Sequence, residues 1–314
     1  ISFIGLFYLS YRFKIKPFLT ILFASFLSGF FLNISIPETL YLIYKGFYSI
    51  VIVIGPIIIT GTLLGKFLNE TGTSRKMVNT FISYLGINNI PISLNIIGFI
   101  ISIPVFCDAA FILMSSIVKD LSRITKKNII LLSICLATGL YSAHVFVPPT
   151  PGPVAASAII DADIGLLFLI GIIVGAIVSI AGYLWIKFLF KKEFEINAEE
   201  IKSYEFISNR SIISFLPIFL PILLISSLTI INLLDLEINQ FQFLKIFVLI
   251  GKPEIALLVG FITTLIFLRK DKIKHTPSWV IKSLKDSFEI LLITGSGGAL
   301  GYIIRESGII NSLS

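Results

Sequence analysis

Long apolar runs separated by short polar segments constrain this chain more than any other feature. Most of them approach the 20 or so residues that a helix needs to cross the hydrocarbon core of a bilayer. The runs are 17–36, 47–68, 92–118, 129–147, 163–186, 212–232, 246–268 and 286–304. Hydrophobic residues make up 56% of the chain and charged residues 14%, which is more apolar surface than a soluble domain can bury. The alternation typical of membrane β-strands is absent, so the sequence predicts an all-α polytopic membrane protein.

The net charge of +7 does not indicate a nucleic-acid partner, because the basic residues lie between the apolar runs. That distribution is typical of cytoplasmic loops. Cys107 and Cys135 both lie inside apolar runs and have neither a disulfide pattern nor metal-ligand spacing. No metal and no other cofactor is therefore expected. The first nine residues are too short to span a membrane, and we interpret them as the end of a helix whose start is missing.

The run 92–118 lies between two basic clusters, which determine how it is expected to enter the membrane. Arg75 and Lys76 precede the run, and four Lys or Arg residues follow it at 119–127. A simple span would place one cluster outside, whereas a re-entrant hairpin keeps both in the cytoplasm. Pro104 should break the helix within 102–108, and broken backbone at membrane depth must be covered by protein or water. The hairpin is favoured, and a simple span is the alternative.

A shift of 236 residues, from Lys16 to Lys252, aligns the chain with itself without gaps. Both lysines precede a proline, and the segment 60–72 then meets 296–308 with three identical glycines and one identical glutamate. Chance matches between glycines are the alternative explanation. The loop charges place Lys16 at an inner helix end and Lys252 at an outer one, so the two copies would be inverted. Inverted repeats with broken helices are typical of secondary transporters.

This repeat predicts how the chain is organised. Residues 1–190 would form a first transmembrane repeat, 191–211 a cytoplasmic linker, and 212–314 a second repeat that is inverted and truncated. The counterparts of 92–118 and 129–160 would lie beyond residue 314, so roughly a hundred residues of the second repeat are expected to be missing.

A proline-rich interruption follows the run 129–147. Four prolines between 148 and 153 should end the helix and leave backbone groups that need polar partners. Free amides at a helix end can bind a carboxylate. Ser142, His144 and Thr150 add side-chain donors that suit a polyhydroxy acid, and Gly152 allows a ligand to approach the backbone. A rigid extracellular loop is the alternative.

The run 144–153, followed by Asp163-Ile-Gly165, resembles the signature of the gluconate:proton symporter (gluconate permease) family. The stretches 103–111 and 251–258 are also similar to that family, although Cys107 stands where an aromatic residue is usual. The resemblance implies a multi-pass permease of the bacterial inner membrane that imports gluconate or a related sugar acid with protons. It also implies that Gly297 and Gly298 contribute to the substrate site.

Two ionisable residues are candidates for proton coupling. A charged group at the bilayer centre costs about 2.5–3.5 kcal/mol on insertion scales, so Asp108 in the predicted hairpin is a functional candidate. It could instead cap a hairpin helix or face a cytoplasmic vestibule. His144 could relay a proton or bind the carboxylate, since histidine titrates near neutral pH. A structural histidine that bonds a broken helix is the alternative.

Several other functions stay open at this stage. The chain could transport another small organic acid or amino acid, such as glycerate or D-serine, and broken helices also occur in channels. An intramembrane hydrolase would need a nucleophile with a base, or a set of metal ligands, and the sequence has neither pattern. No enzymatic activity is therefore expected. The expected partners are a sugar acid, protons and the lipid bilayer, and a homo-oligomer is left open.

Overall fold

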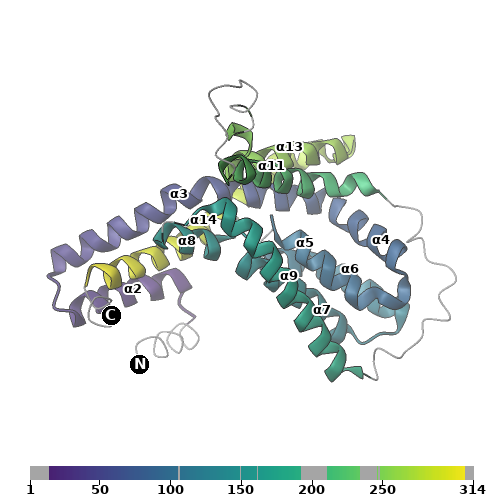
Figure 1. The fold of residues 1–314 in the computed structure, drawn as a ribbon, viewed down its shortest axis with the longest axis horizontal. Helices are drawn as coiled ribbons and strands as arrows, with labels where there is room; N and C mark the ends of the chain where they lie inside the picture. The colour runs from purple at the N-terminus through teal and green to yellow at the C-terminus, as the bar shows by residue number, and fades with distance from the viewer. Residues whose placement is uncertain are drawn as a thin grey trace.

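The computed structural model describes residues 14–104, 107–148, 150–160, 162–191, 211–233, 246 and 248–307. These residues form helices joined by short turns, and no strand occurs among them (Figure 1). The α-helices are α2 (Pro17–Phe31), α3 (Ile36–Glu70), α4 (Thr73–Leu85), α5 (Ile90–Ser102), α6 (Cys107–Thr125), α7 (Ile129–Phe146), α8 (Pro151–Ile160), α9 (Ile164–Leu189), α11 (Leu216–Leu233), α13 (Pro253–Thr264) and α14 (Thr276–Glu306). Short 3-10 helices are η1 (Ile87–Asn89), η3 (Ile212–Phe215), η4 (Leu265–Phe267) and η5 (Lys270–His275). The predicted all-α class is confirmed.

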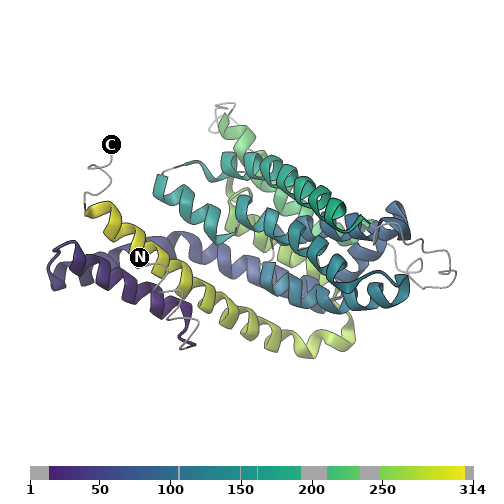
Figure 2. The ribbon, with the colours of Figure 1, turned by 90° about the horizontal axis from the view of Figure 1, so that it is seen from below.

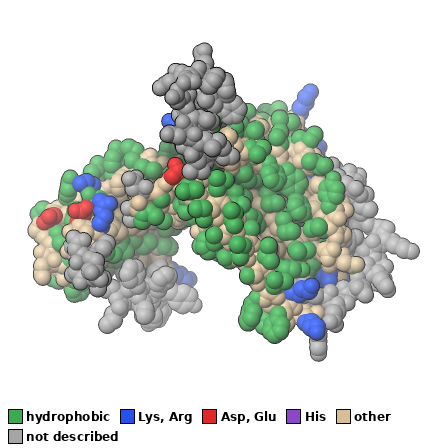
Figure 3. Space-filling model, viewed as in Figure 1, with side chains coloured by type: hydrophobic (Ala, Val, Ile, Leu, Met, Phe, Trp, Pro, Cys, Tyr) green, Lys and Arg blue, Asp and Glu red, His purple; other side chains and the backbone are tan. Residues whose placement is uncertain are grey.

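Within the described part of the chain, four helical segments are long and apolar enough to cross a membrane. They are Ile36–Glu70, Ile129–Phe146, Ile164–Leu189 and Lys270–Glu306. Large apolar side chains remain exposed on these helices, and hydrophobic side chains cover much of the face in Figure 3. Exposed apolar surface on this scale is typical of helices in lipid, which agrees with the predicted polytopic membrane protein.

Two helices begin earlier than their apolar runs predicted. Helix α3 begins at Ile36, where the Ser35 side chain accepts a hydrogen bond from the Glu38 N–H, and α14 begins at Thr276. The predicted starts, at 47 and 286, were therefore too late. Hydropathy records apolar content, whereas a helix continues through polar residues whose helix propensity is good. Most of the predicted linker, 192–210, lies outside the described residues.

The predicted interruption of the run 92–118 lies between α5 and α6. Helix α5 ends at Ser102 and α6 begins at Cys107. An ion pair between Arg75 and Asp120, with an N–O distance of 3.4 Å, joins the basic cluster before α5 to the cluster at the end of α6. This contact supports the prediction that both ends of the hairpin lie on one side of the membrane. Re-entry itself stays a prediction.

Helices α3 and α14 form a long antiparallel pair and lie side by side in Figures 1 and 2. At one end of the pair, a side chain on Gly46 would collide with Tyr302. At the other end, the rings of Phe67 and Trp279 pack edge to face with centroids 5.5 Å apart. Contacts at both ends therefore fix the antiparallel register.

The partners of this pair follow the predicted repeat. Helix α2 packs against α14, and α13 packs against α3, as an exchange of the two copies would require. The residues before α2 and α13 also have the same backbone conformation, with φ −59° and ψ 133° at Lys16 and φ −60° and ψ 133° at Lys252. These similarities support the inverted repeat, which stays a prediction.

Helices α5, α7 and α9 pack closely through small residues. A side chain on Gly139 of α7 would collide with the α5 backbone at Asn95. The Asn95 side chain donates to the Cys135 carbonyl at 3.2 Å and accepts from the Ser179 hydroxyl at 2.9 Å. Close approach and interhelical hydrogen bonds are the main means by which helices associate in lipid. This packing fixes the positions of the ends of α5 and α7, where both helices are interrupted.

Candidate substrate site

Two helix interruptions meet inside the bundle. Ile103, in the α5–α6 interruption, packs in one buried cluster with Ala143 and Val147 at the end of α7. Helix α3 approaches the same place, because a Cβ placed on Gly61 would lie 3.4 Å from the carbonyl oxygen of Pro104. The ends of α5 and α7 thereby lie in one cluster beside the middle of α3, and α8 also contacts α3.

The proline-rich interruption is shorter than the sequence predicted. Helix α7 ends at Phe146 and α8 begins at Pro151. The expectation that all of 148–153 is non-helical is therefore wrong, because Pro151 and Pro153 form the first turn of α8. Proline is tolerated there, since the first amides of a helix have no partner within the helix. Among the described residues, only Val147, Pro148 and Thr150 lie between the two helices.

Two of the predicted side-chain donors are occupied by the protein's own backbone. The Thr150 hydroxyl is buried and donates to the Val147 carbonyl at 2.7 Å. The Ser142 hydroxyl is also buried and donates to the Thr138 carbonyl at 2.6 Å. Both oxygens keep an acceptor capacity. Their role in binding substrate stays a prediction.

The other residues predicted at this interruption lie closer to open space. His144 is half-buried in the last turn of α7. Gly152 is exposed in the first turn of α8, and apart from its chain neighbours and its own helix backbone no atom of the described residues lies within 4 Å of the position that its Cβ would take. The space beside Gly152 can therefore admit a ligand.

The remaining predicted site residues are placed differently from one another. Asp108 is the second residue of α6, and its side chain lies outside the described residues. Gly297 faces open space, whereas a Cβ on Gly298 would collide with Ile50 and lie 2.8 Å from the Gly46 carbonyl oxygen. Gly298 therefore has a packing role between α14 and α3. The assignment of both glycines to the substrate site stays a prediction.

Sequence reasoning did not identify Ser102, the last residue of α5. Its side chain is fully buried, and its hydroxyl oxygen has no hydrogen-bond partner among the described residues. The other buried serine of α5, Ser93, donates to the carbonyl four residues earlier. A buried hydroxyl without a partner is uncommon and indicates a place for a ligand or water. Its position one residue before Ile103-Pro104 was the available signal.

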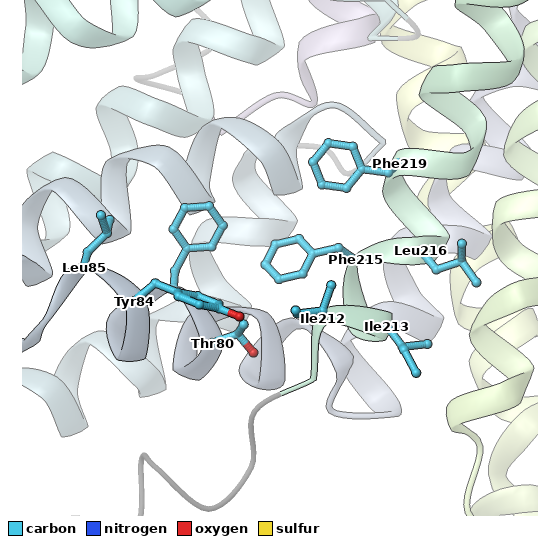
Figure 4. Close-up of a pocket in the computed structure, with 9 residues that line it drawn as sticks. Thr80, Tyr84, Leu85, Ile212, Ile213, Phe215, Leu216 and Phe219 are labelled. Carbon is cyan, nitrogen blue, oxygen red and sulfur yellow. The ribbon is translucent and has the colours of Figure 1, made fainter.

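One hollow lined by described residues has the wrong chemistry for a sugar acid. It has a volume of about 660 Å³ between α4 and the start of α11, and Figure 4 shows its mostly apolar and aromatic lining. The Thr80 hydroxyl in this lining already accepts a hydrogen bond from the Ser211 N–H at 3.0 Å. The hollow therefore offers little to a carboxylate with several hydroxyl groups. Among the described residues, no group of three or more His, Cys, Asp or Glu could hold a metal ion.

Comparisons with known proteins agree with this picture of a permease. The whole chain, residues 1–314, matches the model of the family described as GntP family permease. A Haemophilus influenzae protein named "Uncharacterized permease" is 31% identical over 96% of this chain and 65% of its own length. The inner membrane permease YgbN of Escherichia coli is 27% identical over 96% of this chain and 70% of its own length. A gluconate permease of Pseudomonas aeruginosa is 26% identical over 98% of this chain and 70% of its own length.

The chain thus spans about two thirds of the length of these relatives. No solved structure matches it.

Proposed function

Because the chain belongs to the GntP family of permeases, we propose that it imports gluconate or a related sugar acid by proton symport. It is a multi-pass inner-membrane protein of a permease family, not an enzyme. The relatives named for gluconate support the class of substrate.

The meeting of the two helix interruptions is the observation that carries this proposal. Helix starts direct unpaired amides and a positive partial charge toward a carboxylate, and α6 and α8 are the helices that follow these two interruptions. The Ser102 hydroxyl adds a group that can bond to a sugar hydroxyl, and Gly152 leaves room beside α8. A sugar acid has the carboxylate and the hydroxyl groups that such a site would bind.

Proton coupling is assigned in this proposal to Asp108, with His144 as a second candidate. Asp108 lies in the first turn of α6 at the hairpin interruption. His144 lies in the last turn of α7, beside the second interruption. A carboxylate and an imidazole on the two sides of one site would allow protonation to accompany binding of the substrate.

Alternating access would follow from the inverted repeat. The antiparallel α3–α14 pair, with α2 on one member and α13 on the other, supports a two-fold relation between the two halves. In transporters of this kind, one repeat rocks or slides against the other around a site near the midplane.

Uptake of labelled gluconate by full-length protein in proteoliposomes tests the proposal. We expect saturable uptake that requires an inward proton gradient and collapses when a protonophore is added. Non-saturable flux would identify a channel, and uptake that is indifferent to the protonophore would remove proton coupling. Glycerate or D-serine competing better than other aldonates would overturn the sugar-acid assignment.

A further inference from the structure

The first half of α14 has three distinct faces. One face packs on α3, with Ser283 and Ser287 buried and the Ser287 hydroxyl bonded to that of Thr62. A second face is exposed and apolar, and it consists of Ile281, Leu284 and Phe288. A third face, the charged stripe, is also exposed and consists of Lys282, Lys285, Asp286 and Glu289.

The separation of the two exposed faces distinguishes lipid from water. On one side of this helix half, Ile281 is 68% exposed and Phe288 is 62% exposed. Large apolar side chains grouped in this way are unfavourable in water. A helix surrounded by lipid would not carry four charges on the other side. The apolar face therefore meets lipid, and the charged stripe meets something polar.

The depth of the charged stripe follows from its neighbour. Ser287 lies opposite Thr62, which is eight residues before the end of α3 at Glu70, or about 12 Å along the helix. The polar end of the pair is marked by Glu70, whose carbonyl accepts a hydrogen bond from the Lys272 side chain. Between these levels α3 contributes mainly apolar side chains, Leu64, Phe67 and Leu68, and its one charged side chain there, Lys66, is ion-paired with Glu70. Asp286 and Glu289 therefore lie below the polar surface, at the depth of an apolar part of α3.

The four charges do not neutralise one another through ion pairs. Lys282 and Asp286, and likewise Lys285 and Glu289, are four residues apart on one helix, the spacing at which such pairs form. None of the four takes part in a salt bridge within the described part of the chain. Charges at such depth face a water-filled cavity or a protein interior.

We propose that the charged stripe of α14 lines a water-filled path that leads from the cytoplasmic end of the molecule toward the middle of the bundle. Gly297 lies eight and eleven residues beyond Glu289 and Asp286, on the same side of the helix and also facing open space. The path would therefore continue along α14 to a residue of the predicted substrate site. Its use by substrate and protons rests on the proposed function, whereas its hydration does not.

Cysteine labelling of full-length protein, in a background with Cys107 and Cys135 replaced by alanine, tests this proposal. Glu289→Cys and its neighbour Phe288→Cys form one matched pair at the same depth. Lys285→Cys and Leu284→Cys form a second pair, which keeps the test valid if one variant does not insert. Inside-out vesicles are treated with a negatively charged, membrane-impermeant methanethiosulfonate, and complete reaction in denaturing detergent confirms the total thiol.

We expect the two charged-stripe cysteines to react about tenfold or more faster than their apolar neighbours, because a cysteine ionises to its thiolate in water and the thiolate attacks the reagent sulfur, releasing methanesulfinate. Protection of all four cysteines would overturn the proposal and show that protein or lipid covers the charged stripe. Equal reaction of all four would also overturn it, because the whole helix half would then stand in water. If the charged-stripe cysteines are labelled but the protein does not take up gluconate, the water-filled path is supported and only the proposed substrate is contradicted.

Discussion

The two helix interruptions contrast in how they use their polar groups. Between α7 and α8, the Thr150 hydroxyl and amide both bond to the Val147 carbonyl, and the Thr150 carbonyl accepts from the Val154 N–H. Between α5 and α6, the Ser102 hydroxyl is buried without a partner among the described residues. The polar groups of Thr150 in the α7–α8 interruption are bonded within that segment, whereas the α5–α6 interruption keeps a buried hydroxyl, that of Ser102, without a partner among the described residues.

This contrast separates a structural interruption from one that is prepared for a ligand. Prolines that start a helix shorten the α7–α8 interruption, and a threonine closes what remains. No such closure occurs among the described residues of the hairpin end, which also precedes the turn that carries Asp108. We therefore expect substitutions at the hairpin interruption to affect transport more, and those at 147–150 to affect stability more.

The largest expected effect is that of Asp108→Asn, which should abolish proton-driven accumulation of gluconate while leaving counterflow exchange partly intact. The amide cannot release a proton at neutral pH, but it keeps the size of the side chain. Asp163→Asn is the matched control, because Asp163 caps α9 by accepting from the Leu166 N–H, and asparagine also caps helices. Accumulation at the wild-type rate in the Asp108 variant would remove this residue from proton coupling.

Ser102→Ala should raise the KM for gluconate about tenfold, because a ligand hydroxyl left without a partner costs about 1–3 kcal/mol. The thermal stability of the substrate-free protein should not fall, since the hydroxyl has no bond to lose there. Ser93→Ala on the same helix is the control and should leave the KM unchanged. If the KM of the Ser102 variant equals that of the wild type, the hairpin interruption does not bind substrate through this residue.

Gly152→Val should raise the KM by a smaller factor, because the added side chain would occupy space beside α8 that a ligand needs. Apart from its chain neighbours and the backbone of its own helix, no atom of the described residues lies within 4 Å of the new Cβ, so the thermal unfolding temperature should change little. Gly152→Ala provides a graded control with an intermediate KM. Wild-type kinetics at normal expression would place the ligand away from this turn.

Thr150→Val should have the smallest effect on the KM. The variant keeps the side-chain shape but leaves the Val147 carbonyl without its hydroxyl donor, which should lower the free energy of unfolding by about 1–2 kcal/mol. If Thr150 were instead a donor to the substrate, as the sequence predicted, the same variant would raise the KM and change folding little. A raised KM without a loss of thermal stability would restore the sequence-based role of Thr150 and weaken the contrast between the two interruptions.

Much of the fold could be predicted because its signals are local. A long apolar run indicates a helix in lipid. Pro104 and the prolines at 148–153 also predicted where helices end, because α5 ends at Ser102 and α7 ends at Phe146. The proline-rich run also carried the family resemblance, which the family model then confirmed over the whole chain. Helix boundaries were less predictable, as α14 shows, because polar residues such as Lys282 interrupt hydropathy but not a helix.

The sequence by itself determined a polytopic helical permease and the positions of its interrupted helices, because hydropathy and proline act within a few residues. The tertiary structure alone decided which of two adjacent glycines packs on α3 and which stays open. It also decided that the Ser142 hydroxyl donates a hydrogen bond within its own helix, whereas the Ser102 hydroxyl has no partner among the described residues. These differences arise from contacts and local geometry that the identity of a residue does not encode. The charged stripe of α14 could likewise be recognised only in the tertiary structure, because the contact with α3 shows which face of α14 is buried and which faces are exposed.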